Sequence, residues 1–234
     1  MTWSILARDT RYGTIGAAVA SRFFATGAIC LAVEGRVGAL STQALVNPMY
    51  AVNAMPRLRA GEDPAAILTD LIGPDAGADQ RQLHILDASG RIAQHTGPGC
   101  INWAGHVRDT DVSVAGNMVA GEAVVRRTLE AFLASNGPLP ERLLAAMQAG
   151  EAAGGDKRGK QSAALRICSA DPYPDLDIRA DDHPDPLAEL HRLYRVSQER
   201  FAVFRRFLPG ADSPCGVLDR AVIDAAIQRE RRPP

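Results

Sequence analysis

The sequence predicts an α+β fold, a four-layer αββα sandwich in which two antiparallel β-sheets pack face to face and helices cover their outer faces. Two observations support this prediction. Four short apolar runs joined by tight turns precede any helical pattern, and then two helices, strands, two helices and strands follow in blocks. The early turns are too short for the crossover connections of a parallel sheet, so antiparallel pairing is expected.

The first four strands are expected within the first 40 residues. Residues 8–13 are polar and end in Gly13, which is typical of a hairpin connection. The second strand consists mainly of small residues, so another element must pack closely against it. The four expected strands are residues 2–7, 14–20, 28–33 and 37–40.

Helical patterns follow these strands. Apolar residues recur at helical spacing from Pro48 to Ala60, and Gly61 ends the pattern. Asp63 is a suitable N-cap for the next helix, with Pro64 at its first position. The remaining core elements are expected as strands at 81–86, 91–95, 111–115, 162–168 and 176–179, and as helices at 64–72, 122–134 and 140–149.

A proline-rich run of residues 181–186 (DDHPDP) predicts a boundary between a sandwich domain, residues 1–182, and a C-terminal helical extension, residues 183–234. One helix is expected from Leu187 to Leu208 and another over 217–229. The apolar stripe of the first helix either packs back on the sandwich or forms a partner interface, and we expect a homodimer.

Composition narrows the range of functions. The formal net charge of -1 gives no electrostatic reason to expect binding to nucleic acid or to an anionic membrane. There is no apolar run of about 18 residues and no basic-then-apolar leader, so a protein of the cytoplasm is expected. The cysteines and histidines lack metal-ligand spacing, so neither a metal nor another cofactor is expected.

Thr2 is the candidate nucleophile. If Met1 is removed, Thr2 carries both a hydroxyl and a free α-amino group, whose unperturbed pKa near 8 suits a base at neutral pH. The simpler interpretation is an ordinary strand residue after the initiator methionine. The hairpin and sheet expected around Thr2 favour the catalytic interpretation, because a rigid sheet can hold such a terminus in place.

Two further residues are candidate catalytic groups. Arg22, at the end of the second strand, can bind a substrate carboxylate or lower the pKa of the amine. Asn117, between glycines after a strand, is a candidate donor to an oxyanion. The alternatives are a surface arginine and a turn that needs a positive φ.

Two segments are candidates for substrate binding. Ser41, Thr42 and Gln43 are expected to follow the fourth strand and to offer hydroxyl and backbone N–H donors, or else to cap the next helix. Residues 154–160 (GGDKRGK) are rich in glycine and charge and lead into a strand. Asp156, Gln161 and Ser162 are therefore expected at the rim of a site, with a solvated loop as the alternative.

Several segments resemble a bacterial family, the domain-of-unknown-function (DUF) family 1028, over about residues 2–195. They are residues 2–5 (TWSI), 16–24 (GAAVASRFF), 41–44 (STQA), 47–48 (NP), 103–106 (WAGH), 116–118 (GNM), 153–159 (AGGDKRG), 161–163 (QSA) and 181–184 (DDHP). The resemblance implies the fold of the N-terminal-nucleophile (Ntn) hydrolases, which proteasome subunits and many amidohydrolases share. A proteasome-like site also has an aspartate at the end of the second strand and a lysine on the third. Here Ser21 and Arg22 occupy the former place, and residues 28–33 contain no lysine.

The leading hypothesis is a hydrolase of a non-peptide C–N amide bond in a small molecule, with Thr2 as nucleophile. In this hypothesis Asn117 and backbone N–H groups hold the oxyanion. The alternative is a non-catalytic binding or assembly protein that retains the fold. Ser4 or Ser41 is a third possibility as nucleophile, although the sequence shows no base for either.

Overall fold

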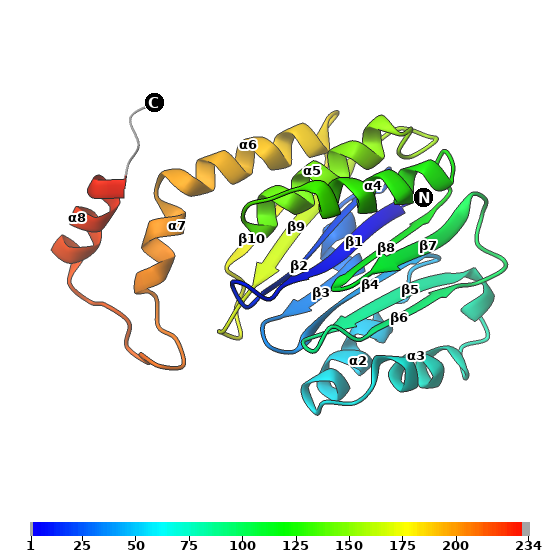
Figure 1. The fold of residues 1–234 in the computed structure, drawn as a ribbon, viewed down its shortest axis with the longest axis horizontal. Coiled ribbons are helices and arrows are strands. Elements are labelled where there is room, and N and C mark those ends of the chain that lie inside the picture. Colours follow the sequence, from blue (N-terminus) through cyan, green and yellow to red (C-terminus); the bar gives the residue numbers. More distant parts are fainter. Residues whose placement is uncertain (1, 231–234) are drawn as a thin grey trace. The chain divides into compact units, whose positions relative to one another are not determined.

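The computed structural model describes residues 2–230 and has the predicted α+β sandwich architecture (Figure 1). The larger sheet has six antiparallel strands in the order β10-β9-β2-β1-β8-β7, and the smaller has four in the order β3-β4-β5-β6. The strands are β1 (Thr2–Asp9), β2 (Thr14–Ser21), β3 (Leu31–Glu34), β4 (Gly38–Ala44), β5 (Arg81–Asp87), β6 (Ile92–Thr96), β7 (Ala104–Asp109), β8 (Val112–Asn117), β9 (Ser162–Cys168) and β10 (Leu176–Ala180).

Two helices cover the outer face of each sheet, so the four-layer prediction is confirmed (Figure 1). Helices α4 (Glu122–Ala134) and α5 (Leu139–Ala152) lie on the six-stranded sheet. Helices α2 (Met49–Arg59) and α3 (Pro64–Ile72) lie on the four-stranded sheet. Asp63 caps α3 as expected, accepting a hydrogen bond from the Ala65 backbone N–H at 2.8 Å.

The small residues of β2 allow neighbouring side chains to pack closely against this strand. A Cβ atom at Gly16 would lie 2.5 Å from Ile167 of β9 and 3.1 Å from Leu143 of α5. The expected close neighbours are therefore an adjacent strand and a covering helix.

Some boundaries differ from the sequence prediction. The expected third strand begins instead as a short helix, α1 (Thr26–Cys30), and becomes extended at Leu31. Strand β7 was not predicted, because this half-exposed edge strand lacks apolar alternation. Strand β4 continues through Ala44 and β8 through Asn117, so polar residues expected in loops belong to strands.

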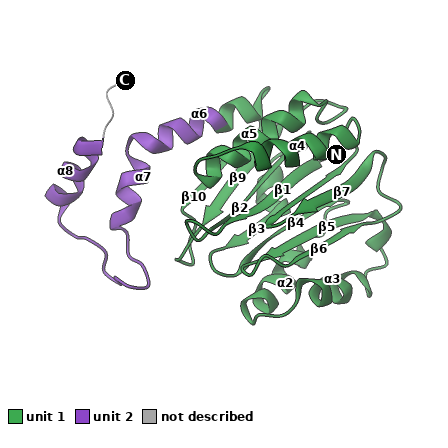
Figure 2. Ribbon diagram, viewed as in Figure 1, with its two compact units in different colours: residues 1–190 green, residues 191–234 purple. Residues whose placement is uncertain are grey.

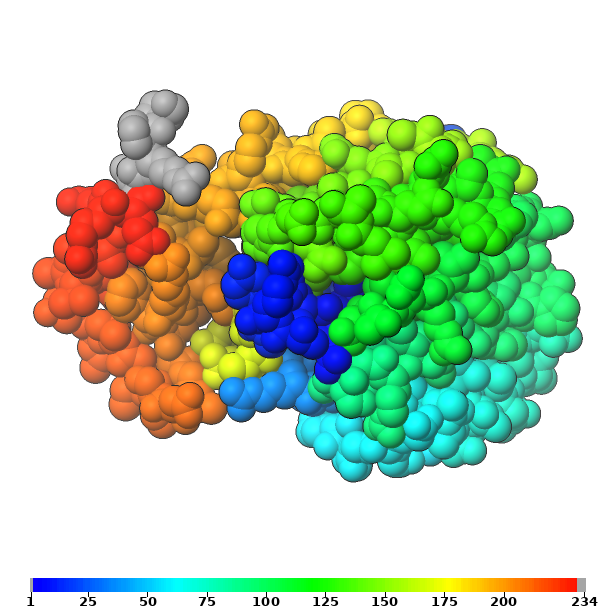
Figure 3. All heavy atoms as spheres, in the orientation of Figure 1, coloured from blue at the N-terminus to red at the C-terminus, as the bar shows by residue number. Residues whose placement is uncertain are grey.

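The space between the sheets is apolar at one end and polar at the other. Leu6, Val19 and Val33 belong to a buried cluster between the sheets. Ser4 instead meets polar side chains of the opposite sheet. In Figure 3 the β1–β2 turn, in blue, reaches the surface, and Thr2 lies at the other end of β1.

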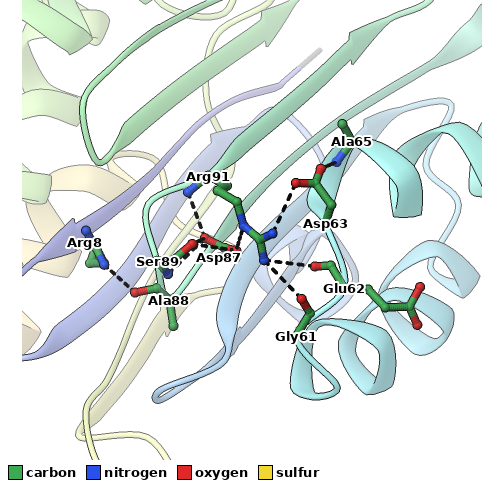
Figure 4. A network of polar contacts seen from close by, with 9 residues as sticks. All are labelled: Arg8, Gly61, Glu62, Asp63, Ala65, Asp87, Ala88, Ser89 and Arg91. Atoms are coloured by element: carbon green, nitrogen blue, oxygen red, sulfur yellow. Dashed lines mark hydrogen bonds and ion pairs between the residues drawn. The ribbon is translucent and has the colours of Figure 1, made fainter.

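A polar network secures the β5–β6 turn to the connection between α2 and α3 (Figure 4). Arg91 donates to the Asp87 carboxylate at 2.6 Å, to Asp63 at 3.2 Å and to the Gly61 carbonyl at 3.2 Å. Burial opposes ionisation of Asp87, but hydrogen bonds from Ser89 and Arg91 outweigh it and lower the pKa of Asp87. The network stabilises the four-stranded sheet, and its residues are distant in sequence from Thr2.

The chain forms two compact units, residues 1–190 and 191–234 (Figure 2). The first includes the start of α6 (Pro186–Glu199). The second contains α7 (Phe201–Phe204), the 3₁₀ turn Arg205–Phe207 and α8 (Arg220–Glu230), and it has a small core that includes Val203, Ile223 and Ile227. The prediction of one helix from 187 to 208 is wrong, because Arg200 leaves the helical conformation, with φ −142° and ψ −45°. Nowhere in residues 2–230 is a helix long and apolar enough to span a membrane.

Candidate active site

A row of polar residues crosses four adjacent strands at one end of the six-stranded sheet. Thr2 lies opposite Ser21 of β2 and opposite Asn117 of β8, and Ser21 lies opposite Ser162 of β9. Directly opposite residues place their side chains on the same face of a sheet. Ser4 contacts the other sheet, and Thr2, two residues earlier, points to the same side. The Thr2 hydroxyl therefore faces the end of the gap between the two sheets.

Polar contacts on three sides hold Thr2. Its Oγ1 donates to Ser21 Oγ at 3.2 Å. Its carbonyl accepts from Asn117 Nδ2 at 3.4 Å and from Gln43 Nε2 at 3.5 Å. The residue is 6% exposed. Met1, whose removal the hypothesis requires, lies outside the described residues.

Gln82 determines how the Asn117 amide is oriented. Gln82 Nε2 has three oxygen acceptors within 3.0 Å, on Thr96, Gly105 and Gly116. Gln82 Oε1 therefore faces the other way and accepts from Asn117 Nδ2 at 3.0 Å. Gln82 is fully buried and was not among the site residues expected from the sequence.

In this orientation the free atom of the Asn117 side chain is a hydrogen-bond acceptor, whereas the sequence predicted a donor. Its Nδ2 hydrogens are directed at Gln82 and at the Thr2 carbonyl. Its Oδ1 is buried and has no hydrogen-bond partner within residues 2–230. The available atom is an acceptor, so the Asn117 side chain does not serve as the expected oxyanion donor.

A cavity of about 200 Å³ adjoins Asn117. Its lining is mainly apolar, and it lies where β4 and β8 end. The lining includes Leu45, Cys100, Ile101, Asn117 and Met118.

A second hollow, of about 540 Å³, lies beyond the end of β2, where Arg22 follows Ser21. Arg22, Lys160 and Gln161 line it, together with Gly159 and Pro184. The structure thus brings together Arg22 and Gln161, which the sequence singled out separately.

Asp156 holds the glycine-rich loop against β2. Its buried carboxylate accepts from the Arg22 backbone N–H at 3.0 Å and from the Arg158 backbone N–H at 2.8 Å. The Gln161 backbone N–H donates to the Ser21 carbonyl at 2.9 Å, and Gln161 Nε2 donates to Asp182 at 3.1 Å. Asp156 therefore positions Arg22, and its carboxylate is already occupied by these donors.

Lys160 was not among the expected site residues, although it lies in the same loop. It forms ion pairs with Glu151 at 3.3 Å and with Asp185 at 3.0 Å. Burial opposes its charge, but the two carboxylates outweigh burial and raise the pKa of Lys160. Lys160 thus stays cationic at the edge of the hollow.

Two other expected groups have structural partners. Ser41 and Thr42 lie within β4, so the expectation of a donor loop after that strand is wrong. Thr42 Oγ1 accepts from the Asn47 backbone N–H at 3.3 Å. In this segment it is Gln43 whose side chain reaches Thr2. Ser162 donates to the Phe23 carbonyl and accepts from the Thr26 backbone N–H, which secures the connection after β2.

Ser4 has a base that the sequence did not reveal. Its Oγ lies 2.8 Å from His84 Nε2, and His84 Nδ1 lies 2.7 Å from Ser113 Oγ. All three residues are 0% exposed, so no substrate can reach Ser4 without opening the sandwich. Burial, with a smaller effect of His106, lowers the pKa of His84 to about 3. The group is a neutral link between the sheets.

The alternation in β5 is the signal that could have revealed these buried groups. Leu83 and Ile85 pack on the helix side, so Gln82 and His84 point between the sheets. In a sandwich covered on both faces, the polar members of such an alternation are buried as well. No cluster of His, Cys, Asp and Glu suited to a metal ion occurs in the described part of the chain.

A family model and solved structures match this chain. The crystal structure of protein SPO2555 from Silicibacter pomeroyi, a DUF1028 protein, is 31% identical, with a TM-score of 0.86 over 93% of this chain and 99% of that one. Anbu (ancestral β-subunit) from Yersinia bercovieri is 13% identical over 89% of this chain and 98% of that one, and its TM-score of 0.35 is too low to bear on the fold. No curated protein matches. Residues 2–190 match the family of unknown function DUF1028, and the chain belongs to that family.

Proposed function

We propose that this protein hydrolyses a non-peptide C–N amide bond in a small molecule, with Thr2 as the nucleophile after removal of Met1. The observation that carries the proposal is the position of the Thr2 hydroxyl at the end of the gap between the sheets. A rigid central strand holds it, with hollows on the β2 side and the β8 side.

The chemistry needs no group beyond the chain and water. The free α-amine of Thr2 takes the Oγ1 proton as Oγ1 attacks the amide carbon. The tetrahedral intermediate collapses, the C–N bond breaks, and the leaving amine takes the proton from the Thr2 ammonium. The acyl group is left as an ester on Oγ1. Water then hydrolyses this ester, with the α-amine again as base, and releases the carboxylic acid.

The oxyanion of the tetrahedral intermediate needs donors other than the Asn117 side chain. Both hydrogens of that amide are directed at acceptors within the protein. We assign the role to backbone N–H groups around the row, because such groups are fixed in place before the reaction.

The test combines intact mass with an electrophilic probe. We expect the purified chain to lack Met1 and a β-lactone probe to acylate Thr2, located by peptide mass spectrometry. Thr2→Ala abolishes labelling, and Thr2→Ser retains it because a hydroxyl remains beside the amine. Thr10→Ala, on the exposed β1–β2 turn, is the matched control and labels as the wild type does.

Retention of Met1, or equal labelling of Thr2→Ala, would contradict the proposal. The non-catalytic alternative, a binding or assembly protein, then becomes the better description. The proposal also includes a free small-molecule substrate, a cytoplasmic location and a homodimer formed through the C-terminal helices.

A further inference from the structure

The two hollows beside Thr2 differ in character. The register places Ser21 on one side of Thr2 and Asn117 on the other, each one strand spacing of about 5 Å away. Beyond Ser21 lies the hollow lined by Arg22, and beside Asn117 lies the smaller apolar cavity. A molecule lying across Thr2 thus has a cationic environment at one end and an apolar one at the other.

Arg22 is the cation suited to an anionic ligand. Its guanidinium donates to the Arg158 carbonyl and, among residues 2–230, forms no ion pair with a carboxylate. Lys160, on the same lining, is already balanced by Glu151 and Asp185. A guanidinium can bind a carboxylate through two parallel hydrogen bonds, so Arg22 retains donors for such a group.

Asn117 determines the orientation of a bound substrate amide, that is, which of its acyl and amine halves faces Arg22. Its Oδ1 is a buried acceptor without a partner in the described chain, and Asn117 is one of the residues that line the smaller cavity. A secondary amide offers one donor, its N–H. If this N–H meets Asn117 Oδ1, the amine half lies in the apolar cavity and the acyl half extends towards Arg22.

We infer that the substrate is a monoamide of a short dicarboxylic acid, with its free carboxylate bound by Arg22 and its amide N–H accepted by Asn117. The amine half is then a small apolar group, as the lining by Leu45, Ile101 and Met118 requires. This inference rests on the proposed function, because it takes Thr2 as the point of attack.

The kinetic test compares two amides of equal length. Glutaric acid mono(N-propylamide) carries the carboxylate, and N-propylpentanamide has a methyl group in its place. We measure kcat/KM from the release of propylamine. We expect it to be at least about tenfold higher for the first amide, because a charge-assisted hydrogen bond to the carboxylate is worth about this factor. Arg22→Gln removes this preference, so that the variant hydrolyses the two amides with similar kcat/KM.

Lys157→Gln is the matched control. Lys157 lies in the same loop, with its Nζ 3.5 Å from the Asn102 carbonyl, and does not line the hollow. This variant keeps the wild-type preference. Replacing the substrate N–H with N–CH₃ lowers kcat/KM in the wild type, since Asn117 Oδ1 then meets no donor.

A binding arm separates the two proposals. The Thr2→Ala variant, titrated calorimetrically with glutaric acid mono(N-propylamide), binds it, and the additional Arg22→Gln change abolishes binding. If Thr2→Ala binds the amide but the wild type does not hydrolyse it, the proposed reaction is refuted and the inferred class of ligand stands. Hydrolysis of both amides at equal rates, or binding that does not depend on Arg22, overturns the inference about the substrate and leaves the Thr2 reaction standing.

Discussion

At the scale of single residues, buried polar groups distinguish the end of the sandwich around Thr2 from an ordinary core. Gln43, Gln82 and Asn117 form a chain of hydrogen bonds that ends at the Thr2 carbonyl. Such groups are costly to bury without partners, so the network fixes one arrangement of the two sheets. The unsatisfied Asn117 Oδ1 is an exception, which is why it points to a ligand.

His84 leads to a prediction about stability and pH. Its folded-state pKa of about 3 lies below the usual value of 6.5. Between these pH values the unfolded chain binds a proton that the folded chain does not, so the free energy of unfolding falls as pH falls below 6.5. The slope is at most about 1.4 kcal/mol per pH unit.

Urea unfolding between pH 4.5 and 6.5 checks this prediction, since most carboxylates have already ionised in that range. We expect His84→Gln to remove this part of the slope. An unchanged slope in the variant would show that other groups cause the pH dependence.

At the scale of elements, most helices and strands follow from local pattern, and the exceptions have physical reasons. Strand β7 is an edge strand whose exposed side chains carry no apolar alternation. Residues 28–30 are apolar but helical, because a short apolar run suits either state and tertiary packing decides between them. Arg200 interrupts a helical pattern that periodicity alone continues to Leu208.

The N-cap of α3 allows a test at this scale. Asp63 caps the helix and also forms an ion pair with Arg91 at 3.2 Å, between side chains that are about half exposed. We expect Asp63→Ala to lower the free energy of unfolding by about 1 kcal/mol. Asp63→Asn retains most of it, because asparagine caps equally well and exposed ion pairs contribute little.

Chemical denaturation of both variants gives the measurement. If Asp63→Asn loses as much stability as Asp63→Ala, the ion pair with Arg91 and not the cap is the stabilising contact.

At the scale of the whole molecule, the sandwich has its own core, and the second unit has a small one. Residues 191–234 expose several large apolar side chains, which a dimer interface would cover. These are Val196, Phe201, Phe204, Val217, Leu218 and Val222. The two compact units divide after Leu190, within α6.

Truncation after Leu190 tests this division. We expect both the full and the shortened chain to unfold cooperatively. By light scattering we expect the shortened chain to be monomeric and the full chain to have twice its sequence mass. A monomeric full chain would refute the homodimer. A shortened chain without a cooperative transition would show that the sandwich needs the second unit.

By itself the sequence determined the fold class and the order of most elements, because periodicity, turn residues and caps are local properties. It also marked Thr2, Arg22 and Asn117 as candidate site residues. The tertiary structure alone decided what these residues can do. Strand register placed Ser21 and Asn117 beside Thr2, and the opposite sheet supplied Gln82, which turns Asn117 from a donor into an acceptor. These contacts join residues up to 115 positions apart, and hydrogen-bond direction depends on all partners at once, which no local pattern encodes.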